Sequence, residues 1–393
     1  MQNHKSEKAR ILWIAELEFS SSPHKTRLIE MISNLQQDFD IHLLTVYRNE
    51  KVQPKVFQNE IIYSCEFSIP YLKRFSRYVC QRLAAPSLLK RLKPDILIMN
   101  CSNLRLFKYC ASRKQKYNYR LIFDVRTLAV DSNPVRNWLN SRLLTSCLRY
   151  AAKHFDGMTY ITDQMKQYCI KEYGLAPHAS AIWTSGVNPE MFSPSKVSSE
   201  PHPFTILYHG HVSRQRRIDN AVKAISLLRD IDVRLNVLGD GDAFENLKEL
   251  VKNLGIEKQV SIERTVDYEE VPERINRSDI GILPFNDWHS WNVSSPIKLF
   301  EYLACGKPVV VTEIPAHRNV LKDAECAFWA KESSPEHVAM AIRNAYDKRR
   351  DFDRLSREAR ELVLREYTWQ RQAEKLGRFC DSLLSNNDSS SSA

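Results

Sequence analysis

One segment of the chain combines a helix start with a carboxylate that could bind a sugar. Residues 294–311 read Ser-Ser-Pro-Ile-Lys-Leu-Phe-Glu-Tyr-Leu-Ala-Cys-Gly-Lys-Pro-Val-Val-Val. Ser295 and Pro296 favour a helix start, with Pro296 near the first helical position, and Gly306 favours its end. The unpaired backbone N–H groups of a helix start can bind an anion such as a phosphate. Glu301 follows about one turn in, where its carboxylate could accept from ribose hydroxyls.

A second candidate segment is a glycine turn followed by a cluster of arginines. A predicted strand over 204–209 runs into Gly210, and Arg214, Arg216 and Arg217 come before the next predicted helix. Arginine offers bidentate donors and permanent charge, which suits a diphosphate. A transferase that works without a metal needs such cations to stabilise the departing diphosphate. A solvated basic loop is the alternative interpretation.

These two segments resemble the nucleotide-sugar site of the family 4 retaining glycosyltransferases. The run Ser-Pro-x-Lys-x-x-Glu-Tyr at 295–302 is similar to that of a variant branch of this family, and the likeness spans roughly residues 10–384. The resemblance implies an α/β protein with the GT-B fold, in which two Rossmann-like doubly wound domains face a central cleft. It also implies that a hexose-type sugar is moved from a nucleotide diphosphate to a hydroxyl with retention of configuration.

The resemblance also implies which residues bind the donor. Arg216 stands at the family's diphosphate-binding Lys, Arg214 is the second choice, and His211 replaces the usual Arg. Glu301 would bind the ribose, and Lys298 is either a phosphate contact or an exposed helix lysine. The residues expected to bind the donor are Gly210, His211, Arg214, Arg216, Gly239, Asn292, Ser294, Ser295, Pro296, Ile297, Lys298 and Glu301.

The family's Glu-x7-Glu signature is only half present, because Val293 stands where the first Glu is expected. The contact of that Glu with the sugar hydroxyls must then come from Asn292, Ser294 or Ser295. The run Gly-Asp-Gly-Asp at 239–242 begins like a dinucleotide fingerprint but lacks the third glycine. We therefore interpret it as a structural turn near the base pocket.

In the first half, a predicted strand over 120–125 has Asp124 near its carboxyl end, and Arg126 follows it directly. Arg126 stands at the position of a histidine in many relatives, so the catalytic residues implied by the resemblance are Arg126, Asp124, Arg216 and Glu301. Arg126 would bind a phosphate or a sugar hydroxyl, and it cannot act as a base because it stays charged. The alternative is a structural ion pair of Arg126 with Asp124 or Asp131.

The acceptor side is less defined. The first predicted strand leads into Ser21, Ser22 and His24, where the family usually has a glycine-rich loop. We expect acceptor contacts from these three residues, although His24 fits an ordinary helix-start residue better.

Positive charge is concentrated in the first half of the chain. The net charge is +10, and residues 1–195 contain 28 Lys and Arg against 16 Asp and Glu. Such a surface favours an anionic partner, either membrane lipid or nucleic acid. No nucleic-acid motif is present, so we expect an anionic membrane or a lipid-linked acceptor and no nucleic acid. A basic face selected for solubility is the alternative.

Strands alternate with helices along most of the chain, which predicts parallel sheets covered on both faces. The linker is expected near 190–204, where four prolines fall among polar residues. The expected parts are an acceptor-side domain at 1–192, a nucleotide-sugar domain at 193–366, a helix crossing back at 367–384 and a disordered tail at 385–393.

Nine scattered cysteines without a Cys-x-x-Cys pair indicate reduced thiols and a cytoplasmic protein. No apolar run is long enough to span a membrane, so any membrane association is expected to be peripheral. No Asp-x-Asp motif occurs, so we expect no metal and no cofactor, with a UDP- or GDP-sugar as substrate.

The sequence thus predicts a hexosyltransferase that acts on a glycan or lipid-linked acceptor in cell-surface polysaccharide synthesis. Because Val293 and His211 depart from the family pattern, the alternative is a catalytically degenerate GT-B protein that binds nucleotide or glycan without turnover.

Overall fold

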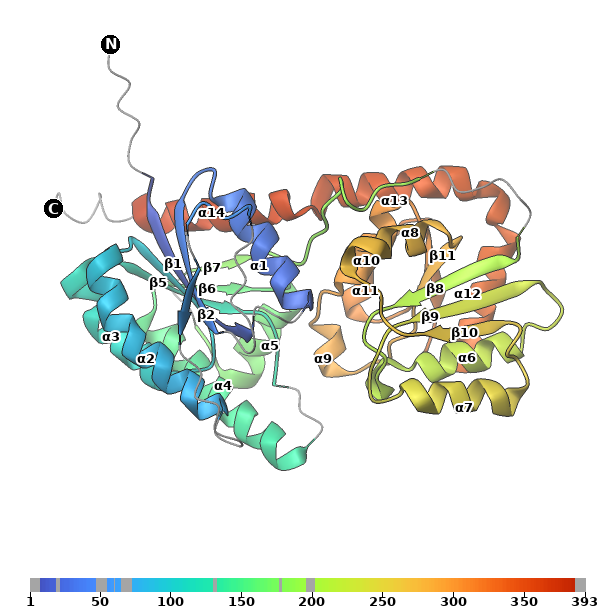
Figure 1. The fold of residues 1–393 in the computed structure, drawn as a ribbon, viewed down its shortest axis with the longest axis horizontal. Coiled ribbons are helices and arrows are strands. Elements are labelled where there is room, and N and C mark those ends of the chain that lie inside the picture. The colour runs from blue at the N-terminus through green and yellow to red at the C-terminus, as the bar shows by residue number, and fades with distance from the viewer. Residues whose placement is uncertain are drawn as a thin grey trace, which may run out of the picture. The chain divides into compact units, whose positions relative to one another are not determined.

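The structure is a computed structural model that describes residues 8–18, 22–46, 55–59, 61–64, 73–129, 133–176, 179–195 and 202–385. The chain divides into two compact units (Figure 1). Unit 1 comprises Met1–Thr184 with Trp369–Ala393, and unit 2 comprises Ser185–Thr368. Each unit is a parallel sheet flanked by helices, as the alternation of strands and helices predicts.

Unit 1 contains a seven-stranded sheet in the order β3-β2-β1-β4-β5-β6-β7, in which every neighbouring pair is parallel. Ile11, Leu12 and Ile14 of the interior strand β1 (Arg10–Glu18) are fully buried, as expected of a strand covered on both faces. Its strands are β1 (Arg10–Glu18), β2 (Asp40–Val46), β3 (Ile62–Ser64), β4 (Ile96–Asn100), β5 (Arg120–Val125), β6 (Gly157–Tyr160) and β7 (Ser180–Ile182).

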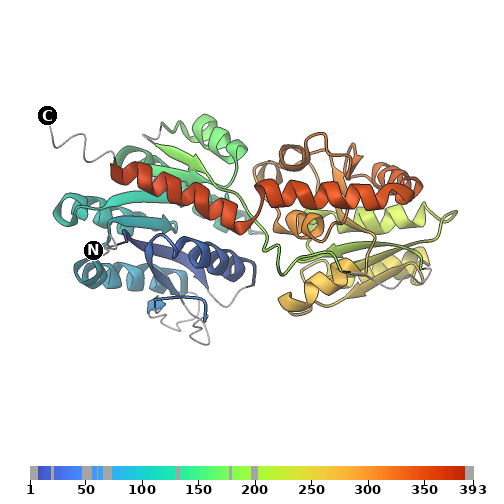
Figure 2. The same ribbon diagram turned by 90° about the horizontal axis from the view of Figure 1, so that it is seen from above.

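Two groups of helices cover the sheet of unit 1. Helix α3 packs between α2 and α4, whereas α1 packs against the C-terminal helix α14, and Figures 1 and 2 show the sheet between the two groups. The helices are α1 (Ser22–Leu35), α2 (Lys73–Leu92), α3 (Leu104–Tyr117), α4 (Pro134–His154), α5 (Asp163–Tyr173) and α14 (Trp369–Ser385).

Unit 2 contains a six-stranded parallel sheet in the order β10-β9-β8-β11-β12-β13. Its strands are β8 (Phe204–His209), β9 (Val233–Leu238), β10 (Val260–Glu263), β11 (Ile280–Leu283), β12 (Val309–Thr312) and β13 (Ala327–Ala330). Its helices are η1 (Arg214–Arg216), α6 (Ile218–Ser226), α7 (Phe244–Leu254), η2 (Tyr268–Glu270), α8 (Val271–Asn276), α9 (His289–Asn292), α10 (Ile297–Ala304), α11 (Pro315–Leu321), α12 (Pro335–Asp347), η3 (Arg349–Asp351) and α13 (Phe352–Glu366).

The boundary between the units differs from the sequence prediction. It lies at 184/185 and not at 192/193, because the segment after Ser185 is bonded into unit 2. The backbone N–H of Val187 donates to the carbonyl of Tyr367 at 2.9 Å, and Arg360 donates to the carbonyl of Phe192 at 3.0 Å. The prolines near 190–204 therefore do not mark the division. Ser385, the first residue of the expected tail, is the last residue of α14, and the rest of the tail lies outside the described residues.

Within the described part of the chain, no helix is both long enough and apolar enough to cross a membrane.

Candidate functional site

Glu301 lies on α10, buried beside residues from two other elements of unit 2, β8 and η2. Its side chain is only 3% exposed. The phenol of Tyr268 donates to Oε1 at 2.6 Å, and Nε2 of His209 lies 3.2 Å from Oε2. Pro296 precedes α10 as its N-cap and Ile297 is its first residue, so the helix begins one residue later than the sequence pattern predicts. The Tyr268 hydrogen bond thus fixes the carboxylate in the sequence-predicted position, one turn inside the helix, and the His209 ring lies beside it without a hydrogen bond.

Burial decides the ionisation of this cluster. It raises the pKa of Glu301 to about 7, against the lowering effects of the Tyr268 hydrogen bond and the Lys298 charge. Burial also holds the pKa of His209 well below its usual range, and the charges of Lys298 and Arg216 act in the same direction. His209 is therefore neutral near pH 7, whereas Glu301 changes charge there. A carboxylate with this environment can accept hydrogen bonds from ligand hydroxyls once ionised.

Two cations converge on the hydroxyl of Tyr208. Nζ of Lys298 donates to it at 3.1 Å, and Nη1 of Arg216 donates at 3.4 Å. Lys298 is buried, so the interpretation of this residue as an exposed helix lysine is wrong. Burial lowers the pKa of Lys298 well below its usual range, and the nearby Arg216 lowers it further. Nε of Arg216 is buried with no hydrogen-bond partner among the described residues. These donors suit the oxygens of a diphosphate.

Glycines let two loops and Lys298 approach each other. Gly210 has φ +105°, and a Cβ at this position would lie 2.8 Å from Nζ of Lys298. A Cβ on Gly239 would lie 1.9 Å from the carbonyl oxygen of Gly210, so any side chain at Gly239 would collide with backbone. Gly239 is thus required for packing at the ends of β8 and β9, which agrees with its interpretation as a structural turn.

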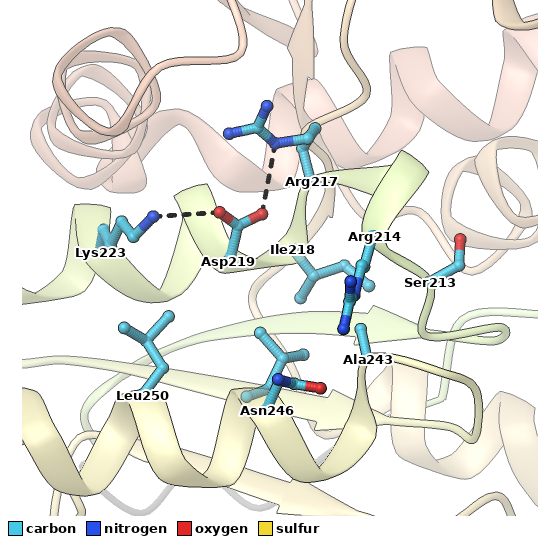
Figure 3. A pocket seen from close by; sticks show the side chains of 10 residues that line it. Ser213, Arg214, Arg217, Ile218, Asp219, Lys223, Ala243, Asn246 and Leu250 are labelled. Carbon is cyan, nitrogen blue, oxygen red and sulfur yellow. Dashed lines mark hydrogen bonds and ion pairs between the residues drawn. The ribbon is translucent and has the colours of Figure 1, made fainter.

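His211 and Arg214, in the loop that follows Gly210, do not join the cluster of Arg216 and Lys298. His211 is exposed and contributes its carbonyl, which accepts from Tyr208 at 2.7 Å. Arg214 is exposed and lines a pocket of about 410 Å³ between α6 and α7 (Figure 3). In this pocket Asp219 pairs with Arg217 at 3.3 Å and with Lys223 at 3.1 Å. Residues of α10 do not line it. Arg216 is therefore the arginine of this loop that joins Lys298.

The residues expected to replace the missing first Glu are engaged locally. Ser294 Oγ donates to the carbonyl of Trp291 at 2.8 Å, and Ser295 Oγ accepts from the N–H of Ser185 at 3.2 Å. Asn292 Nδ2 donates to Asp287 at 2.6 Å, but its Oδ1 is buried with no partner among the described residues. Val293 is buried. Of the three candidates, Asn292 is the residue with an unused polar atom.

In unit 1, Asp124 and Arg126 are buried at the end of β5. Oδ1 of Asp124 accepts from Thr159 at 2.7 Å, and Nη1 of Arg126 lies 4.0 Å away from it. Nη1 of Arg126 donates to the carbonyl of Trp183 at 2.6 Å, and the guanidinium lies 3.5 Å from the centroid of the Trp183 ring. The expected proximity of Asp124 and Arg126 is present, but their separation is longer than a hydrogen bond. The alternative partner of Arg126, Asp131, lies outside the described residues.

Several site residues were not predicted from the sequence. Arg27 on α1 is buried, and the Asp124 carboxylate acts on its charge. A signal was available, because Arg27 lies one turn before the buried Met31, on the apolar side of the helix. Tyr208, His209 and Tyr268 carried no comparable signal, because aromatic residues in or beside strands usually belong to the core.

The expected acceptor residues are mostly beyond what the structure describes. Ser21 lies outside the described residues. Ser22 and His24 belong to the first turn of α1, and their side chains are outside the described part.

The two units have the GT-B fold, and the Glu301 cluster is the candidate functional site of unit 2. Two family models match without a gap between them: "Glycosyltransferase Family 4" over residues 25–191 and "Glycosyl transferases group 1" over residues 192–362. Together they cover well over half of the chain, which belongs to the glycosyltransferases that these models describe.

Known proteins agree with this membership. The chain is 27% identical over 220 residues to a D-inositol 3-phosphate glycosyltransferase of Paenarthrobacter aurescens, which covers 52% of each chain. It thus spans about half the length of this curated relative. Sucrose-phosphate synthase of Thermosynechococcus elongatus superposes with a TM-score of 0.76 at 14% identity, over 96% of this chain and 100% of that chain. HepE of Anabaena, solved in complex with UDP-glucose, gives a TM-score of 0.71 at 13% identity, over 95% and 99%. These structures support the GT-B fold.

Proposed function

We propose that the protein is a retaining glycosyltransferase that moves a hexose-type sugar from a UDP- or GDP-sugar to a hydroxyl of a glycan or lipid-linked acceptor. The observation that carries this proposal is the cluster of Glu301, Lys298 and Arg216 in unit 2, which combines a buried carboxylate with two convergent cations. The UDP-glucose bound by HepE supports a nucleotide-sugar donor. The same proposal includes a role of the transfer in cell-surface polysaccharide synthesis.

In this proposal each member of the cluster has one task. Glu301 accepts hydrogen bonds from the ribose hydroxyls, and Lys298 and Arg216 neutralise the diphosphate, whose charge grows as it leaves. The paired carboxylates of a double-displacement glycosidase are not part of this cluster. We therefore propose a same-face mechanism, in which the departing phosphate helps to deprotonate the acceptor hydroxyl. The cations take the role that a metal plays in other transferases, so no metal or cofactor is needed.

We also propose peripheral association of unit 1 with an anionic membrane. Helices α2, α3 and α4, which pack side by side, carry fifteen Lys or Arg and no Asp or Glu. On α4, Val135, Trp138 and Leu139 are 67%, 53% and 53% exposed, and the Arg142 guanidinium lies 4.3 Å from the Trp138 ring. Exposed aromatic and aliphatic side chains beside arginine are typical of interfacial helices. Such a surface would bring the enzyme to a lipid-linked acceptor.

The test is a donor screen by calorimetry with UDP, GDP, ADP and their sugars, on the wild type and Glu301→Ala. We expect one nucleotide to bind with micromolar affinity and the variant to lose that binding. Absence of binding by any nucleotide to folded protein would contradict the proposal. Binding without hydrolysis or transfer of any sugar would instead favour the degenerate alternative, which the valine at position 293 supports.

A further inference from the structure

Unit 1 holds two buried arginines whose charge is only partly compensated. Arg27 and Arg126 are each only 7% exposed. The carboxylate that acts on both is Asp124. Burying a charge without a partner is costly, so an excess of buried cations is a place where an anion is stabilised.

Asp124 does not satisfy either guanidinium. Its Oδ1 accepts from Thr159 at 2.7 Å and its Oδ2 accepts from Asn100 at 3.2 Å. Its Oδ1 is 4.0 Å from the closest atom of Arg126. The carboxylate is thus bonded within the ends of β4, β5 and β6, and it acts on the two arginines through space.

The free donors of Arg126 form a fork. Nη1 donates to the carbonyl of Trp183 at 2.6 Å, which fixes the plane of the guanidinium over the Trp183 ring. Nε and Nη2, which share the opposite edge of the group, are buried with no hydrogen-bond partner among the described residues. Nε of Arg27 is also buried and has no hydrogen-bond partner among the described residues. An arginine edge of this kind matches the two oxygens of a carboxylate or a phosphate.

We propose that Arg27 and Arg126 form a subsite for an anionic group of a substrate, carried either as the carboxylate of an acidic sugar or as the phosphate of a phosphorylated acceptor. That the bound anion belongs to a substrate rests on the proposed function. The subsite predicts that the enzyme prefers an acidic over a neutral partner molecule.

The test uses the fluorescence of Trp183, because its ring lies against the Arg126 guanidinium. The full-length protein is titrated with inorganic phosphate, D-glucuronate and, as a neutral control, D-glucose, at constant ionic strength and with saturating UDP to fill the donor site. We expect a saturable change with phosphate or glucuronate and none with glucose. A response to phosphate alone indicates a phosphorylated acceptor, and a response to glucuronate alone indicates an acidic sugar. Trp183→Phe should abolish the response.

Variants locate the binding. Arg126→Lys and Arg27→Gln should weaken anion binding by at least about tenfold, the effect of losing a charge-assisted hydrogen bond. Arg105→Gln, which changes an exposed arginine of α3, should leave it unchanged. The proposal would be overturned if the wild type gave no saturable response to either anion. It would also be overturned if both variants bound the anion with the affinity of the wild type. Circular dichroism and UDP calorimetry on the same variants show that each is folded.

The outcomes also separate this inference from the proposed function. UDP binding without an anion response would overturn the subsite and leave the donor site intact. An anion response of the wild type in the absence of UDP, together with no binding of any nucleotide to the same folded protein, would support the subsite and contradict the transferase proposal.

Discussion

Tyr268 donates a 2.6 Å hydrogen bond to Oε1 of the buried Glu301. This bond connects η2 to α10, two elements separated by α8, β11 and α9 in the chain. It favours the ionised carboxylate, whereas burial opposes ionisation. The balance leaves the group close to its titration point near neutral pH, and two of the following predictions depend on that balance.

The pKa of Glu301 predicts a pH dependence of stability. Its folded value of about 7 lies above its ordinary value of 4.5, so the unfolded chain ionises first as the pH rises. The protonated group contributes up to about 3 kcal/mol to the free energy of unfolding. This contribution is fully present below about pH 4.5 and is lost by about pH 7. Glu301→Gln should remove this loss and be more stable than the wild type at pH 8. Urea unfolding at pH 5 and pH 8 measures this, with the exposed Glu313→Gln as the control.

The same group should make donor binding pH-dependent. If ionised Glu301 accepts from ribose hydroxyls, nucleotide affinity should fall as the pH drops from 8 to 6. Glu301→Gln should bind about tenfold more weakly at pH 8 and lose the pH dependence. Calorimetry at both pH values decides this. A pH dependence that persists in the variant would place the titrating group elsewhere.

Lys298 should contribute to diphosphate binding more than to folding. Lys298→Met removes a buried cation of similar length, so stability should change little or rise, because the desolvation of the charge is avoided. Affinity for the nucleotide diphosphate should fall about tenfold or more, since a charge-assisted contact is lost. The matched control is Lys307→Met, whose Nζ donates to the carbonyl of Asn276 at 3.0 Å. Equal nucleotide affinity in both variants would contradict the assignment.

Gly239 should be intolerant of any side chain. In Gly239→Ala the new Cβ would lie 1.9 Å from the carbonyl oxygen of Gly210, so the β8 and β9 loops must separate. We expect a loss of about 3 kcal/mol or more in unfolding free energy and weaker nucleotide binding. Gly255→Ala, at φ +64° with no atom within 4 Å of the new Cβ, should cost only about 1 kcal/mol. Thermal and urea unfolding compare the two.

The membrane proposal predicts a role for the exposed side chains of α4. Trp138→Glu should reduce co-sedimentation with vesicles of anionic phospholipid several-fold, and high salt should reduce the wild type similarly. Leu227→Glu, at an apolar residue of unit 2 that is 51% exposed, is the matched control and should not change binding. Equal binding to neutral vesicles, or preferential binding to RNA, would contradict an anionic membrane as the partner.

Activity should not need a metal ion. Because Lys298 and Arg216 are proposed to neutralise the leaving diphosphate, sugar transfer should be unchanged by EDTA. Loss of turnover in EDTA that Mg²⁺ or Mn²⁺ restores would show that a metal takes part in the reaction.

Local patterns predicted much of unit 2. The alternation of buried strands and helices from β8 to β12 and the helix start before Glu301 are short-range features, and the structure has them close to their expected positions. Predictions failed where long-range packing decides. The prolines near 190–204 suggested the boundary, but the bonds of Val187 and Arg360 hold that segment in unit 2.

The sequence by itself determined the class of fold, the family and the candidate carboxylate, because these depend on residue types at short spacings along the chain. Only the tertiary structure decided that Lys298 is buried against Tyr208 and that Arg27 shares the environment of Arg126. The physical reason is that burial and the distances between charges arise from segments far apart in the chain. Burial sets how strongly each charge needs a partner, and no local pattern contains that information.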